Sequence, residues 1–554
     1  MTVRISLKFG AAALLLVLLG PMILAQEKNA RASINDDPVL QAMSAELDRS
    51  KSKLKMEGVA LPYYIDYRVT DLDAYAAEAA FGALRTNLRT RSRFLRVVVR
   101  VGDYKQDSFF GQGQGVLEIM PLDDDALALR HRIWLATDKA YKAATEAFTA
   151  KQAQLKQYSV DQPVDDFAHA EPVVSVGPLV ELRLDPQPWL KMLQEASALY
   201  ESDSQIESSN SALGVTAVNR YFLNSEGTVV RSGQLYYDLR VSASTQAADG
   251  MRLDRSHADV VLKLNELPSR DAFLARTKQM LATLKQLRDA PVVDEEYRGP
   301  VLFSGDTASE LFGDLLGQSL LGVKPDLGQS ARTKGAFASS YKSRVLPEFL
   351  SVVDDPTLPS INSQDLIGTY DVDDEGVKAA RVSLIEDGRL VNYLLGREPI
   401  RDFPSSNGHG RAQLPQNYPG PSLGNFIVRT AQPLPQEELK KKLLELCKQQ
   451  DLPFGYYAAT FGPNLTPRLL YKVWVKDGHE ELVRGAAFGD LNVRALRNDL
   501  LAAGDDLYID NRMQNIPHSI ASPSILVDNL EVKRANTNKD KLPEYPPPVI
   551  ASRN

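Results

Sequence analysis

The chain has 554 residues, of which 44% are hydrophobic and 24% charged, and its formal net charge is −7 at pH 7. This length indicates two or more domains with ample apolar core. The mildly acidic balance offers no basic surface of the kind that binds nucleic acid, so we expect no nucleic-acid partner. Cys447 is the only cysteine, which excludes an intramolecular disulfide.

Residues 1–25 have the pattern of a signal peptide. Arg4 and Lys8 precede a continuous apolar run from 11 to 19, which a Gly-Pro pair ends. That run is shorter than the roughly 20 residues that span a bilayer. We therefore expect an exported protein, periplasmic or extracellular, that contacts a membrane only if this sequence stays uncleaved.

Residues 26–290 alternate between strand-like and helix-like patterns, which predicts an α+β N-terminal domain. Strands are expected at 63–69, 94–104, 115–122 and 173–184, in a hairpin that turns at Ser225–Gly227, and in further strands up to 264. Helices are expected at 37–56, 127–157, 189–202 and 271–290.

Residues 291–533 are richer in strands, with helices expected only near 307–321, 435–449 and 492–503. The sequence thus predicts a two-domain α+β fold with a strand-rich C-terminal domain. Cys447 lies on the apolar face of the second of these helices, which indicates a buried structural thiol. The tail, 534–554, is polar and rich in proline, and we expect an extended or disordered arm.

The stretch LFGDLLGQSLLG, residues 311–322, has an unusual composition for a helix. Thr307 and Glu310 have the spacing of a capping box, which predicts that a helix starts there. Each of the three glycines costs about 1 kcal/mol relative to alanine in a helix. Glycines kept in such a segment predict close packing or an irregular backbone.

Several blocks along the mature chain resemble the TldD/PmbA family, also called modulator of DNA gyrase. They comprise the 311–322 stretch and residues 217–230, 368–397, 407–413, 421–428, 474–491 and 516–532. The most specific block is 368–397, which contains the DDEG and EDG strands of the family. The resemblance implies the two-domain TldD/PmbA-like fold over most of the mature chain.

The acids of the 368–397 block also resemble a calcium-binding loop, but only loosely, because the EF-hand spacing is absent. We expect the acids between 371 and 375 to lie on a hairpin turn as solvated side chains.

Active members of the family are zinc peptidases that carry His-Glu-x-x-x-His. In register, the resemblance places Gly313, Asp314 and Gln318 at the three motif positions. Gly313 has no ligating side chain, and a neutral glutamine is a weak ligand for zinc. The third ligand in active members is a cysteine, and the corresponding stretch, 509–513, has none. We therefore expect no catalytic residues, no metal ligands and no cofactor, with zinc as the alternative.

The resemblance implies a family that works as a pair, in which a catalytic subunit joins a homologue without the zinc motif. This chain is similar to the non-catalytic kind, with a peptide or unfolded protein as substrate and a TldD-like homologue, or a second copy of itself, as partner. The resemblance also implies substrate-binding side chains, namely Asn407, His409, Arg411 and Asn425. Their amide and guanidinium groups suit a peptide backbone, although they could equally brace their loop.

Two alternatives stay open at this point. The first is an active metallopeptidase with a rearranged metal site, in which Asp314 acts with His409 or His518. The second is a stand-alone peptide-binding or scaffold protein without a peptidase partner.

Overall fold

The computed structural model describes residues 36–157, 164–414, 418–536 and 540–545. The expected signal peptide, 1–25, lies outside the described residues, as does part of the expected tail. Among the described residues, no helix combines the length and the apolar character that crossing a membrane requires.

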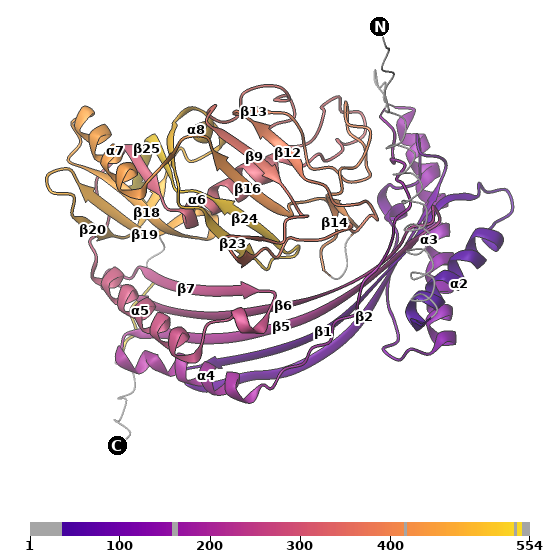
Figure 1. Ribbon diagram of the computed structural model, residues 1–554, viewed down its shortest axis with the longest axis horizontal. Helices are drawn as coiled ribbons and strands as arrows, with labels where there is room; N and C mark the ends of the chain where they lie inside the picture. The colour runs from indigo at the N-terminus through magenta and orange to yellow at the C-terminus, as the bar shows by residue number, and fades with distance from the viewer. Residues whose placement is uncertain (1–35, 158–163, 415–417, 537–539, 546–554) are drawn as a thin grey trace, which may run out of the picture.

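The described N-terminal half is built on one long, curved, seven-stranded sheet. Its strand order is β3-β2-β1-β5-β6-β4, and β7 pairs with β6. The strands are β1 Pro62–Ala80, β2 Ala83–Val101, β3 Val116–Ile119, β4 Val174–Val176, β5 Ile206–Asn224, β6 Val229–Gln246 and β7 Arg252–Val261. All neighbours are antiparallel except β4 and β6. The concave face of this sheet is turned toward the C-terminal half (Figure 1).

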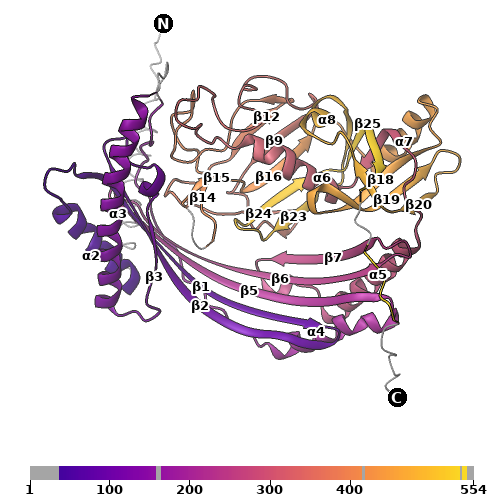
Figure 2. The ribbon, with the colours of Figure 1, turned by 180° about the vertical axis from the view of Figure 1, so that it is seen from behind.

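Helices cover the other face of the sheet at its two ends, as Figures 1 and 2 show. At one end, α2 (Pro38–Lys53) and α3 (Ala126–Leu155) share a core with Tyr67 and Val69 of β1. At the other end, α4 (Gln187–Ala198) and α5 (Arg270–Asp289) share a core with Tyr75 and Ala77. These odd-numbered side chains point to one side of the strand because strand side chains alternate. Three short 3₁₀ turns complete this half: η1 Gly111–Gln114, η2 Leu199–Ser202 and η3 Leu264–Glu266.

Between the two helical layers, the same face of the sheet carries a ladder of paired charges. Asp71 lies opposite Arg93 across β1 and β2, and Asp73 lies opposite Arg91. The Arg93 guanidinium, 2% exposed, donates to Asp71 Oδ2 at 2.7 Å and to Asp124 Oδ1 at 2.9 Å. This ladder explains why the strands expected at 63–69 and 94–104 are much longer than the sequence indicated. Their extensions lack the apolar alternation by which strands are recognised.

The remaining strand expectations of this half have mixed outcomes. The hairpin turn at Ser225–Gly227 is confirmed, because β5 ends at Asn224 and β6 begins at Val229. The strand expected over 173–184 is wrong for most of its length, since only Val174–Val176 pairs.

The C-terminal half contains two larger sheets within its described residues. An eight-stranded sheet has the order β17-β22-β25-β8-β18-β19-β20, with β21 on β25, and a six-stranded sheet has the order β13-β12-β9-β16-β24-β23. The first comprises β8 Tyr297–Phe303, β17 Pro433–Leu434, β18 Phe454–Gly462, β19 Thr466–Trp474, β20 Glu480–Val483, β21 Ala486–Phe488, β22 Leu500–Gly504 and β25 Ile525–Arg534. The second comprises β9 Leu350–Asp354, β12 Val382–Glu386, β13 Arg389–Leu390, β16 Asn425–Thr430, β23 Tyr508–Arg512 and β24 His518–Ser522.

Smaller elements join these sheets. Two short hairpins pair β10 Ser360–Ile361 with β11 Gln364–Asp365, and β14 Gly410–Arg411 with β15 Gly420–Pro421. The helices are α6 Gly305–Leu311, η4 Phe312–Leu316, η5 Gly317–Leu320, α7 Gln436–Gln449, η6 Pro463–Leu465 and α8 Val493–Asn498. Residues of α6 to η5 share one apolar core with strands of both sheets. The stretch singled out in the sequence therefore lies between the two sheets.

Several expectations for the C-terminal half can be compared directly with the structure. The helix at 435–449 is confirmed as α7, and Cys447 on it is fully buried, with burial raising its thiol pKa to about 11. The helix expected at 492–503 is wrong beyond Asn498, because β22 begins at Leu500 and pairs with β25. The mixed α+β fold expected from the sequence is confirmed.

The described part of the tail returns to the first sheet. The Asp540 carbonyl accepts a hydrogen bond from Gln246 Nε2 at 2.8 Å, and its amide donates to the Gly250 carbonyl. This segment therefore docks beside the connection from β6 to β7.

We expect the charge ladder to stabilise the long hairpin. Replacing Arg93→Ala leaves the buried Asp71 with only its partly exposed partner Arg91. Removal of one member of a buried pair costs about 3 kcal/mol or more, which urea denaturation would measure. The matched control is Arg85→Ala, whose exposed pair with Glu78 on the same hairpin contributes less than about 1 kcal/mol. Equal losses in the two variants would contradict a stabilising role for the ladder.

Candidate functional site

We call the segment from α6 to η5, residues 305–320, the motif helix. It begins two residues earlier than the sequence indicated. Ser304 is its N-cap, and Ser304 Oγ accepts from the Thr307 amide at 3.2 Å. The expected capping box of Thr307 and Glu310 is therefore wrong, and the Thr307 hydroxyl donates to the Ala458 carbonyl of β18 at 3.0 Å. The segment continues as a π-helix over Phe312–Leu316 and a 3₁₀ turn over Gly317–Leu320. The irregular backbone expected from the glycines is confirmed.

Gly313 lies where a side chain would require the ends of neighbouring side chains to move. A Cβ atom on Gly313 would stand 2.4 Å from Ile520 Cδ1 and 3.0 Å from Arg512 Nη1. Asp314 and Gln318, the other motif positions, are exposed. The Asp314 Oδ1 atom accepts from Arg512 Nη1 at 3.3 Å. The structure thus places one guanidinium beside both Gly313 and Asp314.

Arg512 comes from the end of β23, within the stretch 509–513 that lacks the cysteine expected of active relatives. Its Nε donates to Asp510 Oδ2 at 2.5 Å, and its side chain is 11% exposed. Its Nη2 is buried without a hydrogen-bond partner in the described part of the chain. Sequence reasoning recorded the missing cysteine and overlooked this arginine. A cation in a stretch where a metal ligand is missing is the signal that could have identified it.

Carboxylates line the side of the motif helix that Arg512 contacts. Burial raises the pKa of Glu310 to about 7, against the lowering effect of Arg512, while the nearby charges of Asp306, Asp510 and Asp314 raise it further. Burial, together with the charge of Asp510, raises the pKa of Asp306 to about 6. Arg512, together with Arg255 at Asp306, therefore compensates a group of acids which burial disfavours in their charged form.

These residues do not fit a zinc ion. Zinc prefers imidazole and thiolate ligands, whereas Gly313 offers no donor and Gln318 offers a neutral amide. The permanently charged Arg512 occupies the adjoining space and would repel a divalent cation. Across 36–157, 164–414, 418–536 and 540–545, no three or more His, Cys, Asp or Glu side chains are grouped so as to hold a metal ion.

The rearranged metal site of Asp314 with His409 or His518 is not assembled among the described residues either. His409 is fully buried, with Nε2 at 3.3 Å from Asp354 Oδ1 and Nδ1 at 3.1 Å from the Asn407 carbonyl. His518 Nδ1 lies 2.9 Å from the Ile516 carbonyl, and burial lowers its pKa. Both histidines are engaged within the protein.

The four side chains expected to bind substrate also have partners within the protein. Asn407 Nδ2 donates to the Tyr393 carbonyl, and its Oδ1 accepts from the Leu395 amide. Asn425 Nδ2 donates to the Asp355 and Leu358 carbonyls, Arg411 Nε donates to Asp374 Oδ2 at 3.0 Å, and His409 contacts Asp354. These contacts tie all four side chains to the loops around them, and Arg411 Nη1 and Asn425 Oδ1 stay buried without a hydrogen-bond partner among the described residues.

The acids between 371 and 375 were expected on a solvated turn, and that expectation is wrong for Asp373 and Glu375, which are buried. Asp373 Oδ1 accepts from the amides of Glu375 and Val377, and its Oδ2 accepts from the Gly410 amide. Burial, followed by the charge of Glu375, raises the pKa of Asp373. The loop folds inward because its backbone amides satisfy these carboxyl oxygens.

The same loop joins the two halves of the molecule. Glu375 Oε2 accepts from the Arg397 amide at 2.6 Å. The Arg397 side chain donates to the Ala168 carbonyl at 2.6 Å and to both carboxylate oxygens of Glu226, at 2.7 and 2.8 Å. Arg68 Nε of β1 donates to the Asp374 carbonyl at 3.1 Å. The concave face of the first sheet is thus held against the C-terminal half by hydrogen bonds from both sides.

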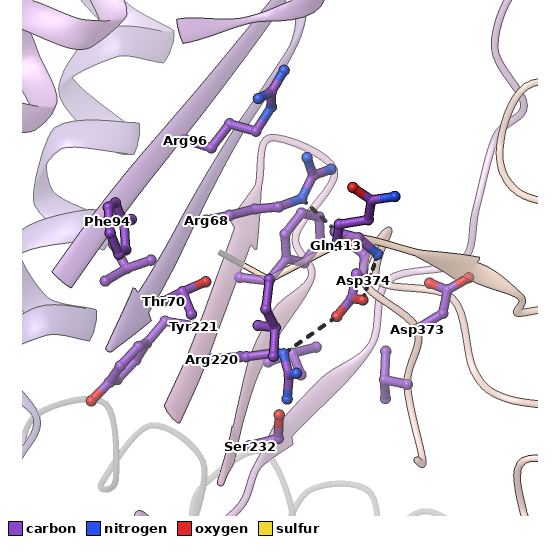
Figure 3. A pocket seen from close by; sticks show the side chains of 16 residues that line it. Arg68, Thr70, Phe94, Arg96, Arg220, Tyr221, Ser232, Asp373, Asp374 and Gln413 are labelled. Carbon is purple, nitrogen blue, oxygen red and sulfur yellow. Dashed lines mark hydrogen bonds and ion pairs between the residues drawn. The ribbon is translucent and has the colours of Figure 1, made fainter. Parts of the chain in front are cut away.

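A small pocket lies at this junction (Figure 3). Its volume is about 50 Å³, and its floor is formed by β1, β2, β5 and β6 while residues 372–374 and 412–414 cover it. Arg68, Arg96 and Arg220 line it together with Asp374. Sequence analysis did not identify these arginines, which come from three different strands.

A larger pocket of about 380 Å³ lies between the end of α3 and residues 324–332. Two of its cations, Lys151 and Lys324, both pair with Asp166, at 2.6 and 2.8 Å. Those contacts give the two lysines a structural role in joining the two halves.

Comparison with known proteins agrees with this fold. Residues 296–534 match the family model described as the PmbA/TldA metallopeptidase C-terminal domain. The structure of TldE from Thermococcus kodakarensis superposes with a TM-score of 0.57 at 15% identity, covering 89% of this chain and 100% of that one. At this identity the likeness shows the fold.

Two curated relatives are similar in sequence. A metalloprotease TldD homolog from Buchnera aphidicola is 24% identical over 253 residues, which are 42% of this chain and 47% of that protein. A metalloprotease from Archaeoglobus fulgidus is 27% identical over 196 residues, 33% of this chain and 42% of that protein. The matched part of this chain therefore spans about half the length of these relatives. The matched C-terminal domain, these relatives and the shared fold together support the TldD/PmbA family for this chain.

Proposed function

We propose that this chain is an exported, non-catalytic subunit of the TldE kind, which shapes a peptide-binding cavity together with a catalytic TldD-like partner in proteolysis. The observation that carries the proposal is the position of Arg512, whose guanidinium lies beside Gly313 and Asp314. A guanidinium supplies positive charge but offers neither a vacant coordination position nor an activated water, which a zinc peptidase needs. Export rests on the signal-peptide pattern of residues 1–25.

The motif helix keeps a structural role in this proposal. It lies between the two C-terminal sheets, and its buried apolar residues belong to the core that they share. The carboxylates on its other side are compensated by Arg512 instead of by a metal ion. The segment can therefore hold the cavity wall in place without carrying out chemistry.

We expect the purified full chain to contain almost no zinc. Elemental analysis after purification without chelators should give well below about 0.1 zinc per chain, since the motif positions supply no imidazole or thiolate. A homologue with an intact His-Glu-x-x-x-His motif, purified in parallel, should retain close to one. About one zinc per chain in this protein would show that the metal site is not lost.

We expect peptide hydrolysis to need the partner's motif and not this chain's Asp314. The two proteins would be co-purified and assayed on casein. Replacing the glutamate of the partner's His-Glu-x-x-x-His motif by glutamine should abolish hydrolysis, because that residue acts on the metal-bound water. Asp314→Asn in this chain is the matched change at the same motif position. It should leave the rate of hydrolysis within about twofold of the wild-type rate, which corresponds to a change of less than about 1 kcal/mol in the activation free energy.

Other outcomes favour other functions. Hydrolysis by this chain alone, abolished by a chelator and by Asp314→Asn, would favour an active enzyme with a rearranged site. Failure to co-purify with any intact homologue, with peptide binding retained, would favour a stand-alone binding protein.

We expect Glu310 to destabilise the folded chain above neutral pH. Its pKa is about 7 in the folded state against an ordinary value of 4.5, so the folded state binds more protons than the unfolded state between these values, and stability falls as pH rises through this window. Glu310→Gln removes this effect, so the stability of the variant relative to the wild type should increase between pH 5 and pH 8. The gain should be on the order of 1 kcal/mol, because solvent screens a partly exposed carboxyl.

Urea denaturation at the two pH values measures this difference. The control is Glu445→Gln on the exposed face of α7, which should show no such pH trend. A constant difference between the Glu310→Gln variant and the wild type would contradict the raised pKa of Glu310.

A further inference from the structure

Three arginines line the pocket of Figure 3, and one of them, Arg68, pairs through Nη2 with Asp66 at 3.1 Å. Arg68 and Arg96 lie directly opposite each other across β1 and β2, and like charges in that position destabilise a sheet. Burial, followed by the charge of Arg68, lowers the pKa of Arg96 to about 10. An anion between these side chains would offset this repulsion.

Arg68 and Arg220 are the arginines whose guanidinium groups could donate hydrogen bonds to a ligand. Arg68 Nη1 is buried and has no hydrogen-bond partner in the described part of the chain. Arg220 forms a long ion pair, with its Nε at 4.0 Å from Asp374 Oδ1. A buried donor without an acceptor costs roughly 1–3 kcal/mol, so a ligand oxygen at this place would recover that energy.

The acids that line the pocket are largely committed elsewhere. Asp374 Oδ2 accepts from Arg411 Nε at 3.0 Å and from the Ala412 amide at 2.8 Å. Asp373 is held by three backbone amides, and burial raises its pKa. Both acids are thus already bonded within the protein, and Arg68 Nη1 has no acceptor among the described residues.

The size and walls of the pocket restrict the anion. A volume of about 50 Å³ exceeds the roughly 10–15 Å³ that one water molecule needs in a cavity, so the pocket has room for a small planar group such as a carboxylate. Apolar side chains complete the lining, among them Phe94, Phe222 and Leu414. A planar carboxylate suits guanidinium forks, and the apolar walls suit an aliphatic group attached to it.

We propose that this pocket binds the C-terminal carboxylate of a peptide, with Arg68 and Arg220 as donors and an apolar last residue against Phe94 and Phe222. The ligand class rests on the proposed function, because a peptide reaches this place only if the cavity between the two halves takes up peptides. The pocket lies on the concave face of the first sheet, where the C-terminal half covers it (Figure 3). It would fix one end of the peptide and hence its direction.

The test compares two fluorescein-labelled peptides, Ala-Ala-Ala-Ala-Leu with a free C-terminal carboxylate and the same peptide with a C-terminal amide. Fluorescence anisotropy with the full chain should show at least tenfold tighter binding of the carboxylate form. Arg220→Gln should reduce this preference to within about twofold, since a charge-assisted hydrogen bond is lost. The matched control, Arg240→Gln, removes an exposed arginine of the same sheet that pairs with Asp238 and should keep the preference.

A second measurement tests anion binding in the pocket independently of peptide binding. Thermal midpoints would be compared in sodium acetate and in sodium chloride of equal ionic strength. Acetate should raise the midpoint of the wild type and of the Arg240→Gln variant, and should not raise the midpoint of the Arg220→Gln variant. Sodium phosphate serves as the comparison for a free inorganic anion. A larger shift with phosphate than with acetate would overturn the assignment of a carboxylate.

The remaining outcomes distinguish the two proposals. Equal binding of the two peptides by the wild type would overturn the carboxylate inference and leave peptide binding intact. Binding of neither peptide, with a stabilising effect of acetate that Arg220→Gln removes, would leave a carboxylate pocket and overturn its peptide ligand together with the peptide-binding cavity. Absence of both effects would overturn both proposals.

Discussion

The architecture depends on the buried loop that carries Asp373, Asp374 and Glu375. Carboxyl groups removed from water must be hydrogen-bonded or paired, and this loop meets that requirement with partners from both halves of the molecule. Glu375 holds the Arg397 amide, the Arg397 side chain reaches Glu226, and Arg68 reaches the Asp374 carbonyl. Because these contacts are short and directional, they fix the position of the C-terminal half over the concave face. The small arginine-lined pocket exists only because this position is fixed.

The carboxyl groups of the motif helix also need a partner, and Arg512 provides the positive charge there. In a zinc peptidase the metal ion would compensate nearby acids, whereas here Arg512 lies against Asp314 and Asp510. The absence of a side chain at Gly313 allows this approach, since a Cβ there would stand 3.0 Å from Arg512 Nη1 and closer still to Ile520. Gly313 and Arg512 therefore lie in close contact. This contact is the observation on which the proposed non-catalytic role rests.

The sequence could predict the family, the α+β class, the α7 helix with its buried Cys447, and the irregular motif segment, because each leaves a local pattern. It could not predict the full length of β1 and β2, since the central part of that hairpin pairs Asp71 with Arg93 where a strand pattern has apolar residues. It also placed Asp373 and Glu375 in solvent, because their partners are backbone amides that folding brings near. Arg512 was overlooked for a similar reason: its meaning comes from Gly313, about 200 positions away in the chain.

The concave face of the first sheet changes character along its strands. Asp66 and Arg68 of β1 form its charged region, and Leu72 on the same strand belongs to an apolar cluster with Val218, Ile367, Leu414 and Met513. Met513 directly follows Arg512, so this cluster connects the arginine-lined pocket with the end of the strand that supports the motif helix. Two buried members of the cluster, Val218 and Ile367, come one from each half, so the cluster packs the two halves together beside the pocket. The pocket and the motif helix are therefore linked through one apolar contact between the halves.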